Sequence, residues 1–579
     1  MCGIAGVLGG AKYVKDAARP LIDTLQHRGP NGIRIEQVGD NSLAHARLSI
    51  IDLEGGWQPL HAAGSTIIGN GEIYNYLELA EQYQLKGKLK TGSDFEPLLH
   101  IYAQEGEKAF EKLRGMYAFC LIGCDGRTWI VRDPFGIKPL SITRNGLSLS
   151  FASEPRALFA DKRTARMPRP EALEDLLALG YVAPDRIYGN TLWRGLEAVE
   201  PGEIDQVITG DREERMISPI PPKGEPVGDE EAALARLDAV LQDSVMVHQR
   251  SDVPYGLFLS GGIDSATVAT LMARLNERPV TGYTCGFDAP GARDERAQAE
   301  RVARALNLDW RETSFGEEDF WRIAPLVAWA HDEPTADYAT LPTYKLAEAA
   351  KGTLTVILTG EGGDELFAGY GRYRRALRPR LLGGRPAEPQ IDAPFLKDRG
   401  HGAMARWRAA AKAPSGLTPL QRAQWGDIAT WLPNDLLLKL DRCLMANGLE
   451  GRTPFLDREV AAFAFHLPDA MKIRDGKGKW LLRKWLERHC PAADPWGKKK
   501  GFTVPVASWI APRAADLGPR IADLKTVTEV CRPEAVKAVF TDDTQAHNRW
   551  PLLFLALWSL IHLDGVAPAQ ALKELLPNG

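Results

Sequence analysis

The chain has 579 residues, of which 44% are hydrophobic and 25% are charged, and its formal net charge is −4. These values are typical of a globular protein with about two to four domains, and the small negative charge argues against nucleic acid or an anionic membrane as a partner. We expect no signal peptide, because Met1 is followed at once by Cys2 and a short apolar run.

The longest apolar stretch, residues 551–563, is too short to cross a bilayer and is more typical of a core helix. The seven cysteines are scattered and odd in number. A disulfide framework is therefore not expected, and a reducing cytoplasm is the favoured location.

The chain opens with MCGIAG, which predicts a strand and places a cysteine at position 2. Removal of Met1 would give Cys2 a free α-amino group beside its thiol. That amine, with a reference pKa of about 7.7–8.0, could serve as base for the thiol. From these residues alone, a chance cysteine in an edge strand is the better interpretation, so the assignment depends on residues further along the chain.

Three further segments carry polar residues at or near strand ends. Residues 45–52 (HARLSIID) predict a strand with one arginine, and residues 67–75 (IIGNGEIYN) predict a strand that ends in Asn-Gly-Glu. Residues 91–94 (TGSD) predict a turn before a helix at 95–105. Taken singly, Asn70-Gly71 could be a hairpin turn and Arg47 a surface ion pair. Beyond them, residues 119–122 and 128–132 predict a pair of strands.

The motifs MCGIAG, HRGP (27–30), RLSI (47–50), NGEIYN (70–75) and TGSD, in this order, resemble class II glutamine amidotransferases of the N-terminal-nucleophile type. The resemblance implies that Cys2 is the nucleophile and that the Asn70 amide and Gly71 N–H form an oxyanion hole. It implies a glutamine pocket formed by Arg47, Leu48, Ser49, Ile50, Ile51, Asn70, Gly71, Glu72 and Asp94. Within it, Arg47 would bind the α-carboxylate, and Glu72 and Asp94 the α-ammonium. Asn31 departs from the Asp that is common after HRGP, and Glu154 is expected to be structural or at a domain interface.

Residues 217–229 contain four prolines and two glycines and predict a linker. It divides the chain into a glutaminase domain at 1–216 and a second domain at 230–579, which begins with a helical pattern over residues 230–250.

The stretch VPYGLFLSGGIDS (253–265) predicts a strand, a sharp turn and a helix from Ile263. Glycines and a helix N-terminus suit a phosphate, yet the turn follows neither the Walker pattern nor GxGxxG. It resembles the pyrophosphate loop of ATP-pyrophosphatases, which make acyl-adenylates. Strands at 280–288 and 353–358 and a helix at 295–306 predict a doubly wound parallel sheet, with ligands at the carboxyl ends of its strands.

Further motifs extend a resemblance to asparagine synthetases over most of the chain. They are TGEGGDELFAGYGRY from Thr359, DEPTADYATLPTY from Asp332, DRCLMANGLEGRTPFLD from Asp441, GKGKWLLRKW from Gly476 and KKKGFTVPV from Lys498. The weakly matched residues 376–417 are expected to form a variable surface insertion. The implied fold is an N-terminal-nucleophile αββα sandwich followed by a parallel-sheet ATP-pyrophosphatase domain with added helices.

This second resemblance implies roles in the chemistry of ATP. The pyrophosphate of ATP would be held by Ser260, Gly261, Gly262 and Ser265, and the adenosine would lie at Leu259, Cys285, Thr359 and Gly360. Asp264 and Asp364 would coordinate Mg²⁺. Lys479 would neutralise the α-phosphate, and Glu361 would accept a proton from ammonia. As alternatives, Lys479 could be a solvated helix charge and Glu361 a cap or ion pair. Asp332 and Glu333 are candidates for the acceptor pocket, and Lys498 to Lys500 could bind phosphate or form a solvated loop.

Together these features predict an enzyme that takes ammonia from glutamine and amidates aspartate with MgATP, giving asparagine, AMP and pyrophosphate. Two alternatives remain open: an enzyme of the same architecture that acts on another carboxylate, such as a cell-envelope sugar acid or peptide, and a non-catalytic protein on the same scaffold. An intact Cys2 argues against a lactam-forming relative. Members of the family are often homodimers.

Overall fold

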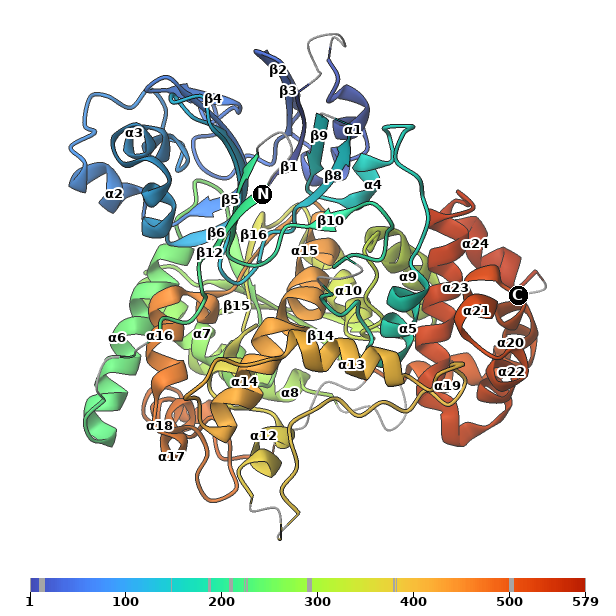
Figure 1. Ribbon diagram of the computed structural model, residues 1–579. Helices are drawn as coiled ribbons and strands as arrows, with labels where there is room; N and C mark the ends of the chain where they lie inside the picture. The colour runs from blue at the N-terminus through green and yellow to red at the C-terminus, as the bar shows by residue number, and fades with distance from the viewer. Residues whose placement is uncertain are drawn as a thin grey trace.

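The computed structural model describes residues 2–9, 16–146, 148–185, 189–207, 212–222, 224, 227–288, 294–378, 381, 383–498 and 504–577. Figure 1 shows two sheets, coloured blue to cyan-green, above a third sheet that is surrounded by helices, with the red C-terminal helices packed at one side.

Within the described residues, the first half of the chain forms two antiparallel sheets of six strands each. The first sheet has the spatial order β10 (Glu197–Ala198), β8 (Ser141–Asn145), β9 (Ser148–Ala152), β1 (Gly3–Leu8), β3 (Asn41–Ala46) and β2 (Ile33–Val38). The second has the order β12 (Arg212–Met216), β11 (Glu203–Val207), β7 (Thr128–Arg132), β6 (Gly115–Ile122), β5 (Ser65–Ile73) and β4 (Leu60–Ala62).

Alternating side chains in the second sheet explain why it is covered on both faces. In β5 and β6, Ile68 and Cys120 join the core between the two sheets, whereas Ile67 and Phe119 face the core formed with helix α3 (Glu96–Glu105). Short helices α1 (Arg19–Asp23) and α4 (Pro155–Leu158) pack on the outer face of the first sheet. The predicted αββα sandwich is thus confirmed, as is the pairing of β6 with β7, where Phe119 lies opposite Val131.

One local prediction for this half was wrong, and one alternative is excluded. The strand predicted over 45–52 ends at Ala46, because the chain leaves the sheet there: the Arg47 N–H donates to Gly32, and the Ile50 carbonyl accepts from Asp252 of the second half. The hairpin alternative for Asn70-Gly71 also fails. Both residues lie inside β5, opposite Ala118 and Tyr117 of β6.

The second half is built on a parallel sheet of five strands within the described residues. Its spatial order is β15 (Asp309–Phe315), β14 (Thr281–Phe287), β13 (Tyr255–Phe258), β16 (Val356–Leu358) and β17 (Glu450–Arg452). The chain proceeds outward from β13 to β15 on one side and from β16 to β17 on the other. The order therefore reverses between β13 and β16, and such a switch point is where doubly wound sheets bind ligands.

Helices cover both faces of this sheet, as the mostly apolar strands require. Val356 and Leu358 pack with α6 (Glu230–His248), α7 (Ile263–Leu275), α8 (Arg296–Ala305) and α18 (Trp480–His489). Ile357, one position along, faces the opposite core with α9 (Glu317–Ala330), α10 (Thr340–Ala350) and α15 (Leu437–Met445). The predicted doubly wound domain is confirmed.

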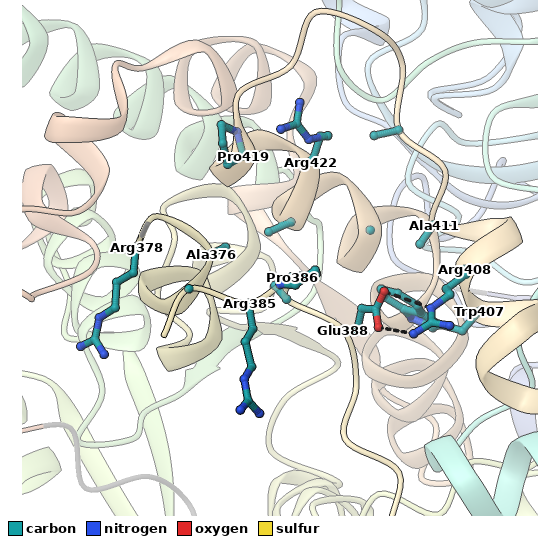
Figure 2. Close-up of a pocket in the computed structure, with 15 residues that line it drawn as sticks. Ala376, Arg378, Arg385, Pro386, Glu388, Trp407, Arg408, Ala411, Pro419 and Arg422 are labelled. Carbon is teal, nitrogen blue, oxygen red and sulfur yellow. Dashed lines mark hydrogen bonds and ion pairs between the residues drawn. The ribbon is translucent and has the colours of Figure 1, made fainter. Parts of the chain in front are cut away.

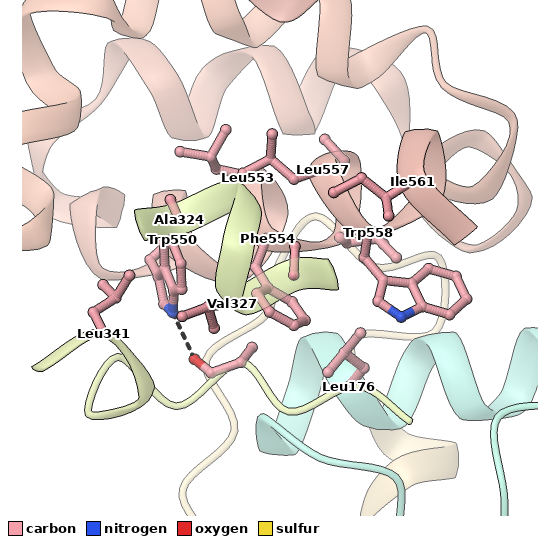
Figure 3. Packing of buried hydrophobic residues seen from close by; sticks show 14 of the residues in the cluster. Leu176, Ala324, Val327, Leu341, Trp550, Leu553, Phe554, Leu557, Trp558 and Ile561 are labelled. Carbon is pink, nitrogen blue, oxygen red and sulfur yellow. Dashed lines mark hydrogen bonds between the residues drawn. The ribbon is translucent and has the colours of Figure 1, made fainter. Parts of the chain in front are cut away.

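The core helix predicted at 551–563 is α23 (Arg549–His562), in which every residue but the partly exposed Pro551 is buried. Figure 3 shows its Phe554 and Trp558 pointing toward Val327 of α9 and Leu176 of α5 (Pro170–Leu179), whereas Leu553, Leu557 and Ile561 lie on the other side of the helix. The indole N–H groups of Trp550 and Trp558 donate to the carbonyls of Ala336 and His331, at 2.8 and 2.9 Å, so burial leaves neither donor unpaired. None of the helices in the described part of the chain combines the length and apolar character that a bilayer span requires.

Candidate functional site

Cys2 directly precedes β1 in the first sheet and lies between β5 and the loop that follows β3. Its backbone N–H donates to Asn70 Oδ1 at 2.9 Å, and its thiol donates to the Leu48 carbonyl at 3.8 Å. Burial raises the pKa of the thiol above its usual value. Ionisation therefore needs a base close by, and a terminal amine on this residue would be such a base.

Two buried donors beside Cys2 lack partners among the described residues. Arg47 is only 2% exposed, which rules out the surface ion pair, and its guanidinium lies 4.9 Å from the Trp57 ring. Its Nη2 donates to the Asp52 carbonyl, but Nη1 has no hydrogen-bond partner in this part of the chain, and neither has Nδ2 of Asn70. Buried donors are nearly always paired in folded proteins, so these two groups, side by side next to Cys2, are suited to bind an anionic or carbonyl ligand.

Gly71 follows Asn70 in β5 and has φ +135°, a conformation that favours glycine. A Cβ there would lie 2.0 Å from the Met116 carbonyl oxygen of β6. Only glycine fits, and the neighbouring strand comes close to the backbone at the predicted oxyanion hole.

Two buried carboxylates complete this pocket. Asp94 accepts a hydrogen bond from the Ile73 N–H at 2.7 Å, and burial raises its pKa to about 7. Burial, reinforced by the charge of Asp94, also raises the pKa of Glu72 well above its usual value. A bound cation would favour the ionised form of both acids, so the pair suits an ammonium group.

The loop from Leu48 to Ile51 forms the rim of the pocket. Leu48 and Ile50 are buried and Ser49 and Ile51 are partly exposed. Asn31, the departure from the family pattern, accepts a hydrogen bond from the Ser49 N–H at 3.0 Å. An amide oxygen can accept this hydrogen bond as well as a carboxylate oxygen can, so Asn31 still holds the loop in place.

The predicted pyrophosphate loop lies at the switch point, between β13 and α7. Ser260 and Ser265 share a hydrogen bond of 2.9 Å between their hydroxyls, and the Gly262 N–H donates to Ser260 Oγ at 3.1 Å. The loop after β16 packs directly on it, because a Cβ on Gly360 would lie 2.8 Å from the Asp264 side chain. The two signature segments therefore form one site.

Lys479 lies between the two predicted metal ligands. Its Nζ is 2.6 Å from Asp364 Oδ1 and is also paired with Asp264, and the residue is only 4% exposed. A solvated helix charge is therefore ruled out. Although burial lowers the pKa of Lys479, the two carboxylates raise it above its usual value.

The positions of the Asp264 and Asp364 carboxylates also suit a Mg²⁺ ion. Two carboxylate oxygens that meet at one ammonium could share a divalent cation instead, and oxygen is the donor that Mg²⁺ prefers. The described part of the chain contains no cluster of three or more acidic, His or Cys side chains suited to a metal. Two carboxylates thus fit a cation whose other ligands come from phosphate and water.

Glu361 lies in the loop that follows β16. It faces a buried lysine, Lys439, that was not among the predicted site residues. Its Oε1 lies 3.9 Å from Nζ of Lys439, which also binds Asp337 at 3.0 Å. Burial raises the pKa of Glu361, which suits a group that accepts a proton near neutral pH. Lys439 was missed in the sequence because this residue lies within the apolar run LLLKL. A lysine in such a run needs a buried partner of opposite charge, and this requirement was the signal that could have identified it.

The remaining nucleotide candidates lie close to these loops. Leu259 and Thr359 directly follow β13 and β16, and the Thr359 N–H donates to the Arg452 carbonyl at 2.9 Å. Gly360 comes next in the chain. Cys285 is not at a strand end, since β14 continues to Phe287, and burial raises its pKa to about 12.

Asp332 and Glu333 lie at the interface between the halves. Asp332 accepts from the Arg156 N–H at 2.7 Å and pairs with Arg442 at 3.1 Å. Glu333 accepts from the Leu192 N–H at 2.6 Å. These contacts assign both residues to the interface, and we do not retain them for the acceptor pocket.

The interface role expected of Glu154 is confirmed. It pairs with Arg28 at 2.8 Å and with Arg442 at 3.3 Å, and Arg28 also pairs with Asp441 at 2.7 Å. All four side chains are almost completely buried. A closed network of charges therefore joins the two halves.

Residues 376–417 are a surface insertion only in part. Leu381 is almost fully exposed, but Phe395 and Leu396 are buried in the main core. A cavity of about 500 Å³ is lined largely by this segment. In Figure 2, Arg408 pairs with Glu388, and Arg378 and Arg385 point away from that pair. The lining of the cavity includes none of the predicted site residues. Of the run Lys498 to Lys500, the last two residues lie outside the described residues.

The αββα sandwich, the cysteine at position 2 and the parallel sheet with its phosphate-type loop together define a class of protein. It is an N-terminal-nucleophile amidotransferase joined to a synthetase of the ATP-pyrophosphatase type. Residues 1–216 match the family model described as glutamine amidotransferase domain, and residues 236–562 match the one described as asparagine synthase. The second match spans more than half of the chain. The chain belongs to the asparagine synthase family.

Several curated relatives cover almost the whole chain. "Asparagine synthetase [glutamine-hydrolyzing] 1" of Bacillus subtilis is 32% identical over 97% of both chains, and a putative asparagine synthetase of Mycobacterium tuberculosis is 32% identical over 100% of both. Asparagine synthetase B of Escherichia coli is 27% identical over 88% of this chain and 83% of its own. Among solved structures, a B. subtilis glutamine phosphoribosylpyrophosphate amidotransferase aligns over 54% of this chain and 65% of its own at 18% identity, and its TM-score of 0.28 carries no weight here.

Proposed function

We propose that this protein is a glutamine-dependent asparagine synthetase, with a glutaminase domain at 1–216, a linker at 217–229 and a synthetase domain at 230–579. In support of these limits, β12 ends at Met216 and α6 begins at Glu230; Lys223, Glu225 and Pro226 of the linker lie outside the described residues. The observation that carries the proposal is the pair of unpartnered buried donors, Arg47 Nη1 and Asn70 Nδ2, around Cys2 in the described part of the chain.

In the first half-reaction, the Cys2 thiolate attacks the side-chain amide carbon of glutamine. The terminal amine takes the thiol proton and passes it to the departing nitrogen, so that ammonia leaves and a thioester remains. Asn70 and the Gly71 N–H stabilise the oxyanion of each tetrahedral intermediate. Water then cleaves the thioester and releases glutamate.

In the second half-reaction, the side-chain carboxylate of aspartate attacks the α-phosphorus of ATP and pyrophosphate leaves. Ser260, Gly261, Gly262 and Ser265 hold the departing pyrophosphate, and Lys479 neutralises charge as it develops. Asp264 and Asp364 would hold Mg²⁺, which supplies positive charge to the phosphate oxygens. Ammonia then attacks the acyl carbon, Glu361 accepts the surplus proton, and asparagine and AMP are released.

The acceptor is the part of the proposal that depends most on the relatives, whose names specify asparagine synthesis. Pyrophosphate release should be measured with MgATP and aspartate, and in parallel with other carboxylates. Pyrophosphate release that requires aspartate supports the proposal. Release only with another carboxylate would mean that this other carboxylate is the acceptor. The homodimer and the cytoplasmic location also remain part of the proposal.

A further inference from the structure

Arg452 belongs to the second half of the chain but extends into the glutamine pocket of the first. It ends β17, and its carbonyl accepts from Thr359 beside the nucleotide loops. Its side chain, completely buried, runs the other way and brings Nη2 to 3.4 Å from Glu72 Oε1. One residue thus contacts both sites.

The guanidinium is held so that one nitrogen is left for Glu72. Nε donates to Glu450 Oε1 at 2.6 Å, and Nη1 donates to the carbonyls of His248 and Arg250 at 2.8 and 2.7 Å. The group lies 5.6 Å from the Tyr74 ring. Because guanidinium is planar, these bonds fix the direction of Nη2, which has no hydrogen-bond partner within the described part of the chain.

Glu72 needs an opposing positive charge. Among the described residues, Asp94 and Glu450 face it with negative charge, Arg452 faces it with positive charge, and the phenols of Tyr74 and Tyr76 are also near. Burial and the two acids favour the neutral form of Glu72, whereas Arg452 favours the ionised form. The ionised form attracts an ammonium group much more strongly than the neutral form does.

We propose that Arg452 is a positioning residue for the α-ammonium of glutamine: it orients the Glu72 carboxylate in the pocket and opposes the negative charges around it. The inference rests on the proposed glutaminase activity. It means that the glutamine site is incomplete without the second half of the chain.

The test measures glutamine binding by calorimetry from about pH 6 to about pH 9 in the full chain carrying Cys2→Ala, which cannot hydrolyse the ligand. Adding Arg452→Gln should weaken binding at least about 10-fold at neutral pH, because a buried charge loses its partner. The loss of affinity toward acid should also begin at higher pH. Arg452→Lys should recover part of the affinity and keep the pH profile of the parent.

Arg114→Gln is the matched control. Arg114 also crosses the interface, but its ion-pair partners are Asp457 at 2.7 Å and Asp243 at 2.6 Å, not Glu72. The substitution should leave both the affinity and the pH profile of the parent unchanged. An equal shift in Arg114→Gln, or an unchanged profile in Arg452→Gln, would overturn the inference.

Glu450→Gln keeps the test decisive if Arg452→Gln fails to fold. Removing this negative charge should have the opposite effect: the pH below which glutamine affinity is lost should become lower. If that pH is unchanged or higher, the inference is contradicted. Failure of the proposed function looks different. In that case the Cys2→Ala parent itself does not bind glutamine.

Discussion

The substitution Lys479→Met removes the cation between Asp264 and Asp364. The lysine Nζ lies 2.6 Å from Asp364 and is also bonded to Asp264, and both carboxylates retain 18% side-chain exposure. Removing one member of a fully buried ion pair costs about 3–5 kcal/mol. Because these carboxylates are partly solvated, we reduce this to about 2 kcal/mol in the free energy of unfolding.

Mg²⁺ should reverse much of this loss. Without the lysine, two facing carboxylates remain that can share a divalent ion, and a ligand that binds only the folded state stabilises it. We expect the deficit to fall below about 1 kcal/mol when Mg²⁺ replaces EDTA. Adenylation should not recover: pyrophosphate release with MgATP and aspartate should stay at least about 100-fold below that of the unmodified protein.

Urea unfolding in EDTA and in Mg²⁺, together with pyrophosphate release, measures all three quantities. Lys345→Met is the control, since Lys345 of α10 pairs at 2.8 Å with Asp319 of α9, a partly buried ion pair that includes neither Asp264 nor Asp364. It should show no response to Mg²⁺. A Lys479→Met deficit that is the same in EDTA and Mg²⁺, or a similar Mg²⁺ response in the control, would refute the reasoning about this site.

Three other predictions concern single positions. The raised pKa of Asp94, about 7, means that the folded protein binds a proton that the unfolded chain has already lost. Stability of the ligand-free protein should therefore decrease between about pH 4 and about pH 7, and Asp94→Asn should flatten this decrease in urea titrations; an unchanged slope would count against it. Gly71→Ala should cost more than about 3 kcal/mol and abolish glutaminase activity, because its Cβ meets the Met116 carbonyl at 2.0 Å. Gly316→Ala, with open space around its Cβ, should cost far less, and similar losses would contradict the argument. Glu361→Gln should still release pyrophosphate with aspartate but form asparagine at least about 100-fold more slowly from ammonia; loss of both steps together would show that Glu361 is not specific to the amide-forming step.

Much of the fold could be predicted because apolar periodicity and turn residues are local signals. The alternation in β6 and β7, the buried run of α23 and the strand–turn–helix at Ser260 all depend on neighbours in the sequence. The early end of β3 could not be predicted in the same way. Its residues alternate like a strand, but the Ile50 carbonyl accepts from Asp252, a contact between the two halves that only the folded chain creates.

The same distinction between local and long-range signals applies to the candidate site. Cys2, Asn70 and Asp264 lie in motifs whose order points to their use, and the structure brings each group of motifs together. Lys439 lies in an apolar run and Arg452 in the family motif that begins at Asp441, but the importance of both comes from partners distant in sequence, Glu361 and Glu72. A buried charge in an apolar segment shows that a partner exists, but sequence alone does not say which.

The central claim is that nitrogen released at Cys2 is joined to an acid activated at the Ser260 loop. The most direct measurement gives the protein glutamine labelled with ¹⁵N in the side-chain amide, together with MgATP and aspartate, and determines product masses. Our account predicts ¹⁵N-labelled asparagine and an equal amount of pyrophosphate. Free labelled ammonia with unchanged aspartate, or label found in another carboxylate's amide, would contradict it.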